Sequence, residues 1–181
     1  MEVNIITRNP DKRFFAESVF GRYGIAVRFI DKDYPEIQAD SSLEIARFTA
    51  LEAAKELGIP VIREDHSFFI DAYGIPGPYM NHFERMIPAT SLLRLLEHEP
   101  DRNAHFSVAT VYAEPDGRTI EHVFEVPVVI EREIKGDIAK GWDALLRFPN
   151  EKRTFAQYPL EERNDIWGQN FEKIARTLLA R

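Results

Sequence analysis

The stretch "SSLEIARFTALEAAKELGIPVIRED", residues 41–65, decides the fold class. Ser41 and Glu44 form a capping box, apolar residues recur at helical spacing after them, and Gly58 is a typical helix end. The apolar run at 59–65 then predicts a short buried strand. A capped amphipathic helix followed at once by a buried strand is the repeating unit of α/β proteins.

The segments on either side continue this alternation. Hydrophobic periodicity and turn residues predict strands at 3–7, 25–31, 59–65, 104–113 and 120–133. The same signals predict a helix that starts at 12 and ends at Gly21 or Gly24, helices at 41–58 and 90–100, and a mostly helical stretch at 161–181. Because the last two strands are joined by the turn-like "EPDGRT", they form a hairpin. The sequence therefore predicts an α/β fold with a mixed sheet flanked by helices.

Composition limits the class of protein. A length of 181 residues fits one domain, or one domain with a small second lobe. A net charge of −7 argues against a broad nucleic-acid-binding face. The sequence has no run of about 18 apolar residues, so we expect no membrane span, and its first residues do not have the pattern of a signal peptide. Cysteine is absent, which excludes thiolate chemistry and agrees with a cytoplasmic protein.

The first candidate site is "TRNPDK", where Thr7, Asn9 and Lys12 lie between a strand and a helix. A helix N-terminus offers free backbone N–H groups, and a hydroxyl, an amide and an ammonium beside it suit a phosphate. The alternative is a turn that starts the helix and carries a surface lysine. The stretch alone does not separate the two interpretations.

Three acids form the second candidate site. Glu36 lies in a loop before the capped helix, and Glu64 and Asp65 end the strand that follows it. Mg²⁺ prefers oxygen ligands and commonly takes one or two carboxylates together with substrate phosphates. If the sheet brings the two loops together, these acids could hold such an ion, as in other open α/β sheets. Alternatively, Glu36 is solvated, and Glu64 and Asp65 cap a turn or pair with arginines.

The third candidate site is "GWD", with Trp142 and Asp143. A flat indole and a carboxylate suit stacking on a base and reading its edge, but such a tryptophan is more often a core or lid residue. The histidines show no zinc-type spacing. GxGxxG, GxxxxGK[ST] and GxSxG are all absent, which removes the commonest dinucleotide, P-loop and α/β-hydrolase interpretations.

Taken in order, these motifs resemble the inosine triphosphate pyrophosphatase family, also called the XTP/dITP pyrophosphatases. The resemblance runs through "TRNPDK", "YPEIQ", the helix–strand stretch up to "GIPGPY", "DRNAHFSVATVYAEPDG", "GWD" and "EERN". It implies that residues 1–181 form a single elongated α/β domain of two lobes, usually dimeric, with the nucleotide in the cleft between them. It also implies hydrolysis of nucleoside triphosphates to monophosphate and pyrophosphate with Mg²⁺, Mn²⁺ being possible, and a preference for deaminated purines.

The resemblance also assigns roles to residues. Asp65 matches the catalytic aspartate that activates water, and Glu36 and Glu64 match acidic metal ligands that act with it. A further group matches residues that contact the substrate: Thr7, Asn9, Lys12, Trp142, Asp143 and Arg163. Arg163 stands where the family usually has a lysine.

Other positions depart from the family pattern. His66 follows Asp65 where a serine or threonine is usual, and Thr49 replaces a phosphate-binding lysine. The Ser-His-Arg segment that helps to read the purine is replaced by Trp167, Gly168 and Gln169. Because Trp167 could stack on any base, the sequence predicts a raised KM and weak discrimination between bases. Two alternatives therefore stay open: a catalytically weak nucleotide-binding relative, and a hydrolase that acts on a different nucleotide anhydride.

Overall fold

The computed structural model describes residues 1–35 and 37–181. Its strands are β1 (Glu2–Ile6), β2 (Ala26–Ile30), β3 (Val61–Ile70), β4 (Ile75–Gly77), β5 (Asn103–Ala113), β6 (Thr119–Ile130) and β7 (Leu146–Arg147). They pair in the order β2-β1-β3-β5-β6-β7, and β4 pairs separately with β3. β1 runs parallel to β2 and β3, whereas the β3–β4 and β6–β7 pairs are antiparallel. The predicted α/β fold with a mixed sheet is confirmed.

The helices are α1 (Pro10–Arg22), α2 (Ser42–Leu57), α3 (Met80–Met86), α4 (Ala89–Leu95), α5 (Asn164–Trp167) and α6 (Gln169–Leu179), with short 3₁₀ turns η1 (Ile138–Ala144) and η2 (Glu161–Arg163). The caps of α2 are as predicted: the Ser41 hydroxyl accepts a hydrogen bond from the Glu44 N–H, and Gly58 has φ +67°. The prediction that residues 161–181 are mostly helical is confirmed, and the helical segments α5 and α6 meet at Gly168. A Cβ atom there would lie 2.6 Å from Val19 Cγ2, so only glycine allows this close approach.

The chain divides into two compact units. Unit 1 comprises residues 1–66, 108–124 and 164–181, and unit 2 comprises residues 67–107 and 125–163. Strands β3, β5 and β6 each contribute residues to both units. The expectation of one domain with two lobes stays a prediction.

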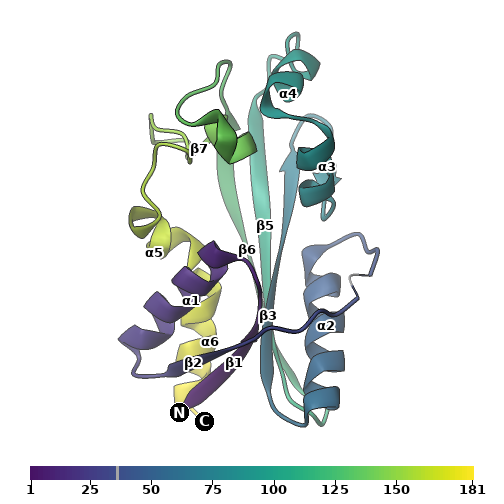
Figure 1. The fold of residues 1–181 in the computed structure, drawn as a ribbon, viewed down its shortest axis with the longest axis vertical. Coiled ribbons are helices and arrows are strands. Elements are labelled where there is room, and N and C mark those ends of the chain that lie inside the picture. Colours follow the sequence, from purple (N-terminus) through teal and green to yellow (C-terminus); the bar gives the residue numbers. More distant parts are fainter. Residues whose placement is uncertain (36) are drawn as a thin grey trace. The chain divides into compact units, whose positions relative to one another are not determined.

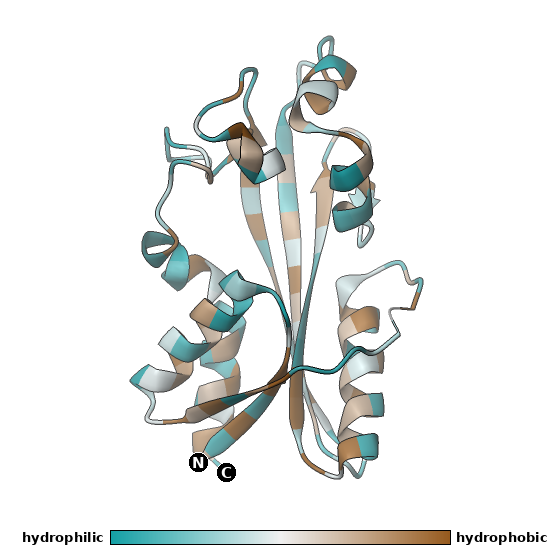
Figure 2. Ribbon diagram, in the orientation of Figure 1, coloured by the Kyte–Doolittle hydropathy of each residue, from teal (hydrophilic) through white to brown (hydrophobic). Residues whose placement is uncertain are grey.

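Unit 1 has helices on both sides of its strands. Figure 1 shows α1 and α6 on one side and α2 on the other. Small residues let α2 pack closely on the strands, in a cluster of Ile6, Ala46, Ala50, Ala53, Ala54, Val61, Val111 and Ala113. On the other side, the rings of Phe20 and Phe171 lie 5.8 Å apart and join α1 to α6. Figure 2 shows hydrophobic and hydrophilic residues interspersed along these helices, as expected for elements with one buried face.

Unit 2 is built around aromatic side chains. The Phe68 ring lies 4.8 Å from that of Phe106 and 5.8 Å from that of Trp142, which brings η1 onto the strands. In the described residues, none of the helices is long and apolar enough to cross a membrane.

Candidate active site

Side-chain direction along β3 separates the two neighbouring acids. Val61 belongs to the cluster under α2, and residues two apart on a strand share a face, so Asp65 points to the α2 side. Glu64 and His66 project from the opposite face. The structure therefore does not bring the side chains of Glu64 and Asp65 together, although they are adjacent in sequence. The metal-ligand role of Glu64 stays a prediction.

Glu64 is buried in a polar cluster. Its side chain is 2% exposed. Its Oε1 atom lies 2.9 Å from His66 Nε2, and its Oε2 atom accepts a hydrogen bond of 2.8 Å from the Thr110 hydroxyl on β5. The His66 ring is stacked on Trp167 of α5, with centroids 5.7 Å apart and planes 13° apart. We call Thr110, Glu64, His66 and Trp167 the Glu64 cluster.

The charges in this cluster follow from its surroundings. Burial works to raise the pKa of Glu64, but the hydrogen bond from His66, the Lys12 ammonium and the Thr110 hydroxyl outweigh it and lower that pKa. Burial lowers the pKa of His66, and the Lys12 charge lowers it further. At neutral pH the cluster thus holds a carboxylate and an uncharged imidazole that donates to it.

The "TRNPDK" segment forms the start of α1. The Asn9 side chain accepts hydrogen bonds from the N–H groups of Asp11 and Lys12, at 2.9 and 3.1 Å, and Thr7 Oγ1 accepts one from the Asn9 N–H. Asn9 is therefore the N-cap of α1, as the helix-start alternative predicted. The Lys12 ammonium donates to the Glu64 carbonyl at 3.0 Å, which brings a positive charge to β3 beside Asp65. Substrate contact by this segment stays a prediction.

The predicted metal site includes Glu36, which lies outside the described residues. Within the part of the chain that the structure describes, no three Asp, Glu or His side chains gather as they would around a metal ion. Asp65, which is only partly buried, offers the carboxylate oxygens that Mg²⁺ prefers. This donor fits an ion that takes most of its remaining ligands from a triphosphate and water.

Trp142 is a core residue of unit 2. It is 1% exposed, its Nε1 atom donates to the Ile87 carbonyl at 2.8 Å, and its backbone N–H donates to Glu84 Oε1 at 2.7 Å. Gly141 before it has φ +62°, and a Cβ atom there would lie 2.2 Å from the same Glu84 oxygen. The indole face suggested for stacking on a base is thus covered in this conformation. Substrate contact by Trp142 stays a prediction.

Asp143 and Arg163 lie near each other in unit 2. Arg163 Nη1 is 3.9 Å from Asp143 Oδ2, and the guanidinium lies over the Phe155 ring. Arg163 is 8% exposed, and its Nε atom has no hydrogen-bond partner among the described residues. A buried guanidinium with one long ion pair retains donors for a polar ligand, and the Asp143 side chain is 37% exposed.

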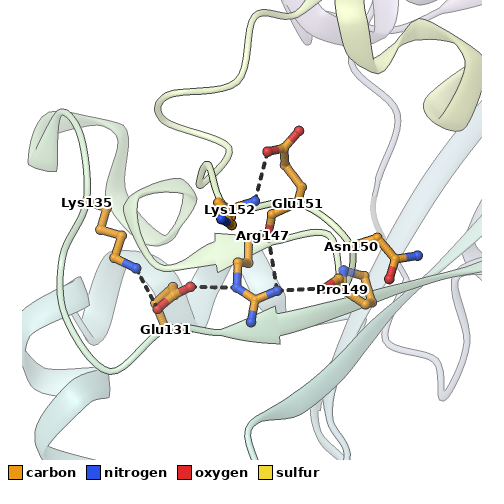
Figure 3. Close-up of a pocket in the computed structure, with 7 residues that line it drawn as sticks. All are labelled: Glu131, Lys135, Arg147, Pro149, Asn150, Glu151 and Lys152. Atoms are coloured by element: carbon orange, nitrogen blue, oxygen red, sulfur yellow. Dashed lines mark hydrogen bonds and ion pairs between the residues drawn. The ribbon is translucent and has the colours of Figure 1, made fainter.

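Unit 2 also contains a polar cavity of about 430 Å³. It is lined by Glu131, Lys135, Arg147, Pro149, Asn150, Glu151 and Lys152 (Figure 3). Glu131 accepts hydrogen bonds from Arg147 Nε at 2.5 Å and from Lys135 Nζ at 3.0 Å. Arg147 Nη1 also donates to the carbonyls of Phe148, Pro149 and Glu151. These charged residues hold the chain after β7 against the end of β6. Their presence around the cavity is therefore explained by structure, without a ligand.

The sequence did not indicate the Glu64 cluster. Thr110 is one of several threonines in the chain, and it lies 46 residues from Glu64. One signal was available: His66 and Trp167 are both departures from the family pattern, and the structure shows that they contact each other. Two unusual residues that appear together can be paired in space.

Comparison with known proteins agrees with the motifs. A family model described as the Ham1 family matches residues 3–175. The chain is 40% identical over 167 residues to the dITP/XTP pyrophosphatase of Methanopyrus kandleri, covering 92% of this chain and 89% of that protein. It is 35% identical over 181 residues to the dITP/XTP pyrophosphatase of Ignicoccus hospitalis, covering 98% and 96%. The solved structure of the Staphylococcus aureus Ham1 protein matches it with a TM-score of 0.80 and 25% identity, covering 99% of both chains. The resemblance is confirmed, and the chain belongs to the Ham1 family.

Proposed function

We propose that this protein is a nucleoside triphosphate pyrophosphatase. It hydrolyses the bond between the α- and β-phosphates and releases nucleoside monophosphate and pyrophosphate. The observation that carries the proposal is the partly buried Asp65 next to the backbone carbonyl that the Lys12 ammonium contacts. This pair stands in a chain that matches relatives named dITP/XTP pyrophosphatases over most of its length.

Asp65 and Lys12 have different roles in the proposed reaction because their charges are opposite. Asp65 accepts the proton of the attacking water, a task that a carboxylate can perform and a neutral amide cannot. Lys12 attracts the triphosphate to the start of α1, where the helix dipole also favours negative charge. Burial of the surrounding strands strengthens both interactions, because they act in a medium of low dielectric constant.

We infer Mg²⁺ dependence, with Mn²⁺ able to replace it. Asp65 and the other two predicted ligands, Glu36 and Glu64, would hold the ion together with the phosphates. When bound, the ion neutralises the charge that develops on the phosphates. Excess EDTA should abolish hydrolysis, and added Mg²⁺ or Mn²⁺ should restore it; full activity in EDTA would contradict the inference.

Our expectation for the preferred base rests on the positions that replace the Ser-His-Arg segment of the family. We infer a deaminated purine substrate with weak discrimination against ATP, because the Ser-His-Arg segment is absent. Trp167 is 6% exposed and already stacked on His66, so its ring is not the base platform that the sequence suggested. Gln169, which is partly buried, can donate or accept and so pairs with an oxo or an amino edge.

The test is a panel of ITP, XTP, dUTP, ATP and GTP with Mg²⁺, scored for pyrophosphate against orthophosphate. Pyrophosphate release from ITP and XTP supports the proposal. Orthophosphate alone would indicate a hydrolase of a different anhydride bond, and binding without release would indicate a nucleotide-binding relative. An ITP/ATP ratio of kcat/KM above about 10³ would contradict the weak discrimination.

The expected assembly and location also belong to this proposal. We infer a homodimer from the resemblance and a cytoplasmic location from the absence of cysteine. The net charge of −7 and the lack of a long apolar run argue against nucleic acid and membrane as partners. Light scattering after size-exclusion chromatography measures the mass in solution, and a mass of 21.0 kDa, that of a single chain, would contradict the dimer.

A further inference from the structure

Arg63 shares a face of β3 with Asp65. Residues two apart on a strand point to the same side, so Val61, Arg63 and Asp65 all face α2. Neighbours in this row are about 6.6 Å apart along the strand. The Lys12 charge acts on the Glu64 cluster, which projects from the opposite face. Arg63 therefore brings a positive charge to the same side of the strand as Asp65.

The Arg63 side chain is held at the end of the neighbouring strand. It is half-buried, and its Nη1 atom donates a hydrogen bond of 3.3 Å to the carbonyl of Ile6, the last residue of β1. β1 lies parallel to β3, with Ile6 opposite Arg63. This contact places the guanidinium at the carboxyl end of β1, which is the end of the strands where ligands bind in open α/β sheets.

Thr49 of α2 has a buried hydroxyl without a hydrogen-bond partner. The residue is 2% exposed, and its Oγ1 atom finds no donor or acceptor among the described residues. It lies one turn from Ala46 and Ala53, which belong to the cluster that packs on the strands. An unpaired hydroxyl is costly in a protein interior and requires an explanation. A bound phosphate oxygen would accept the missing hydrogen bond.

The chain reverses between α2 and β3, which brings Thr49 to the level of Arg63. Residues 58–60 join the two elements, and Figure 1 shows α2 alongside β3. Thr49 precedes Leu57, the end of α2, by about 12 Å along the helix. Arg63 and Asp65 follow the start of β3 by about 7 and about 13 Å along the strand. A buried hydroxyl and a guanidinium thus stand at similar heights on facing elements.

We propose that Arg63 binds the pyrophosphate part of the substrate next to Asp65, with the Thr49 hydroxyl as a second donor. The planar guanidinium forms two parallel hydrogen bonds to a phosphate, which a lysine ammonium cannot do. Toward the start of β3, the space under α2 is filled by Val61 and by alanines with no exposed surface. The small inorganic end of the nucleotide, and not the nucleoside, therefore lies on this side.

The inference rests on the proposed function, because it places the group that the reaction releases. The resemblance to the family assigns no role to Arg63. Its hydrogen bond to the Ile6 carbonyl leaves a purely structural role as the competing explanation. A structural role predicts equal losses of affinity for every ligand of the site, whereas the proposed role predicts a loss confined to pyrophosphate and the nucleotides that contain it.

Isothermal titration calorimetry with inorganic pyrophosphate and Mg²⁺ measures the contact without turnover, and inosine monophosphate is the second probe. Arg63→Met removes the charge and keeps a long side chain. We expect its pyrophosphate affinity to fall by at least about tenfold, as for the loss of a charged hydrogen bond, with unchanged affinity for inosine monophosphate. Arg63→Lys, which keeps the charge and loses the fork, should lie between. Arg28→Met removes an exposed arginine of β2 and is the matched control, which should bind both probes as the wild type does.

A second pair of variants tests the hydroxyl and reads the same site if Arg63→Met does not fold. Thr49→Val keeps the shape of the side chain and replaces the hydroxyl with a methyl group, whereas Thr49→Ser keeps the hydroxyl. We expect Thr49→Val to raise the melting temperature of the free protein, because an unpaired buried hydroxyl is removed, and to lower pyrophosphate affinity by about three- to tenfold. Thr49→Ser should bind pyrophosphate as the wild type does.

The outcomes are distinct. Pyrophosphate affinity within about twofold of the wild type in Arg63→Met would overturn the inference, and so would an equal loss for both probes. Unchanged pyrophosphate affinity in Thr49→Val would overturn the part assigned to Thr49. If the wild type binds pyrophosphate through Arg63 but releases none from any nucleotide, the proposed function fails and the phosphate site stands.

Discussion

Two histidines, one in each unit, make the same pair of contacts. His66 lies 2.9 Å from Glu64 and is stacked on Trp167, while His105 lies 2.7 Å from Asp71 and is stacked on Phe69. The geometry is nearly equal, with ring planes 13° and 18° apart. The carboxylates differ: Glu64 is 2% exposed, whereas Asp71 is 38% exposed.

This difference decides what each pair contributes. In water, an ion pair or hydrogen bond replaces an equally good contact with solvent, and its net contribution is small. In the interior, water cannot replace a lost partner. Removing one member of a buried pair is therefore costly, because the other member is left without a hydrogen bond. The Glu64 pair should therefore determine stability and site geometry, and the Asp71 pair should determine neither.

The largest expected effect is on the rate of hydrolysis, from a change at Asp65, the residue between Glu64 and His66. Asp65→Asn should lower kcat by about 10² to 10⁴, because the amide cannot accept the proton of the water. Fold and most nucleotide binding should be kept. The measurement is pyrophosphate release under saturating nucleotide and Mg²⁺. Asp71→Asn, on the same stretch of chain, is the control and should match the wild type; a half-active Asp65→Asn would remove Asp65 from its catalytic role.

The second effect concerns stability. His66→Ala leaves a Glu64 oxygen without its partner and uncovers Trp167, so the free energy of unfolding should fall by about 2 to 4 kcal/mol. Urea denaturation measures this. His105→Ala is matched in its contacts and differs in exposure. Equal losses in both variants would show that burial does not decide the strength of these pairs.

A third carboxylate has an intermediate exposure. Glu131 is 16% exposed and pairs with Lys135 and Arg147. Burial works to raise the pKa of Glu131, but its hydrogen bonds to Lys135 and Arg147 outweigh it and hold that pKa below the ordinary 4.5.

Glu131→Gln should therefore destabilise the protein by about 1 kcal/mol at pH 7. A lowered folded-state pKa stabilises the protein above the unfolded-state pKa, and this contribution is lost as pH falls through the folded-state pKa. The difference in free energy of unfolding between wild type and variant should be constant between about pH 6 and about pH 8. It should shrink below about pH 4.5. A difference that grows in acid would contradict the sign of the shift.

The smallest expected effect on stability comes from the exposed His105–Asp71 pair. His105→Ala should change the free energy of unfolding by no more than about 0.5 kcal/mol, and added salt should reduce any change further. Urea denaturation at low and high salt checks this. A loss comparable to that of His66→Ala would mean that stacking on Phe69, and not solvent exposure, dominates.

Local signals in the sequence predicted much of the fold. Ser41 and Gly58 fixed the bounds of α2 to within one residue, because both caps act through contacts with their own neighbours. The strand predicted at 59–65 was too short. β3 continues to Ile70, since Glu64 and His66, which resemble a strand end, find their partners within the protein.

The candidate site was less predictable, because its contacts join residues far apart in sequence. Trp142 is held by Ile87 and Glu84, 55 and 58 residues away, and no periodicity shows such pairs. Asn9 illustrates the opposite case: its cap of α1 spans three residues and was among the alternatives. The break at Gly168 could not be predicted, because it depends on Val19 in another helix.

The order in which the two units occur along the chain has a consequence for synthesis on the ribosome. All residues of unit 2 have been translated once residue 163 is added, whereas unit 1 still lacks α5 and α6. Phe20 of α1 then has no Phe171 to pack against, and Trp167 has not yet covered His66. Within these residues, the unit that contains Asp65 thus begins before unit 2 and is completed after it, so part of its apolar packing has to wait for α5 and α6.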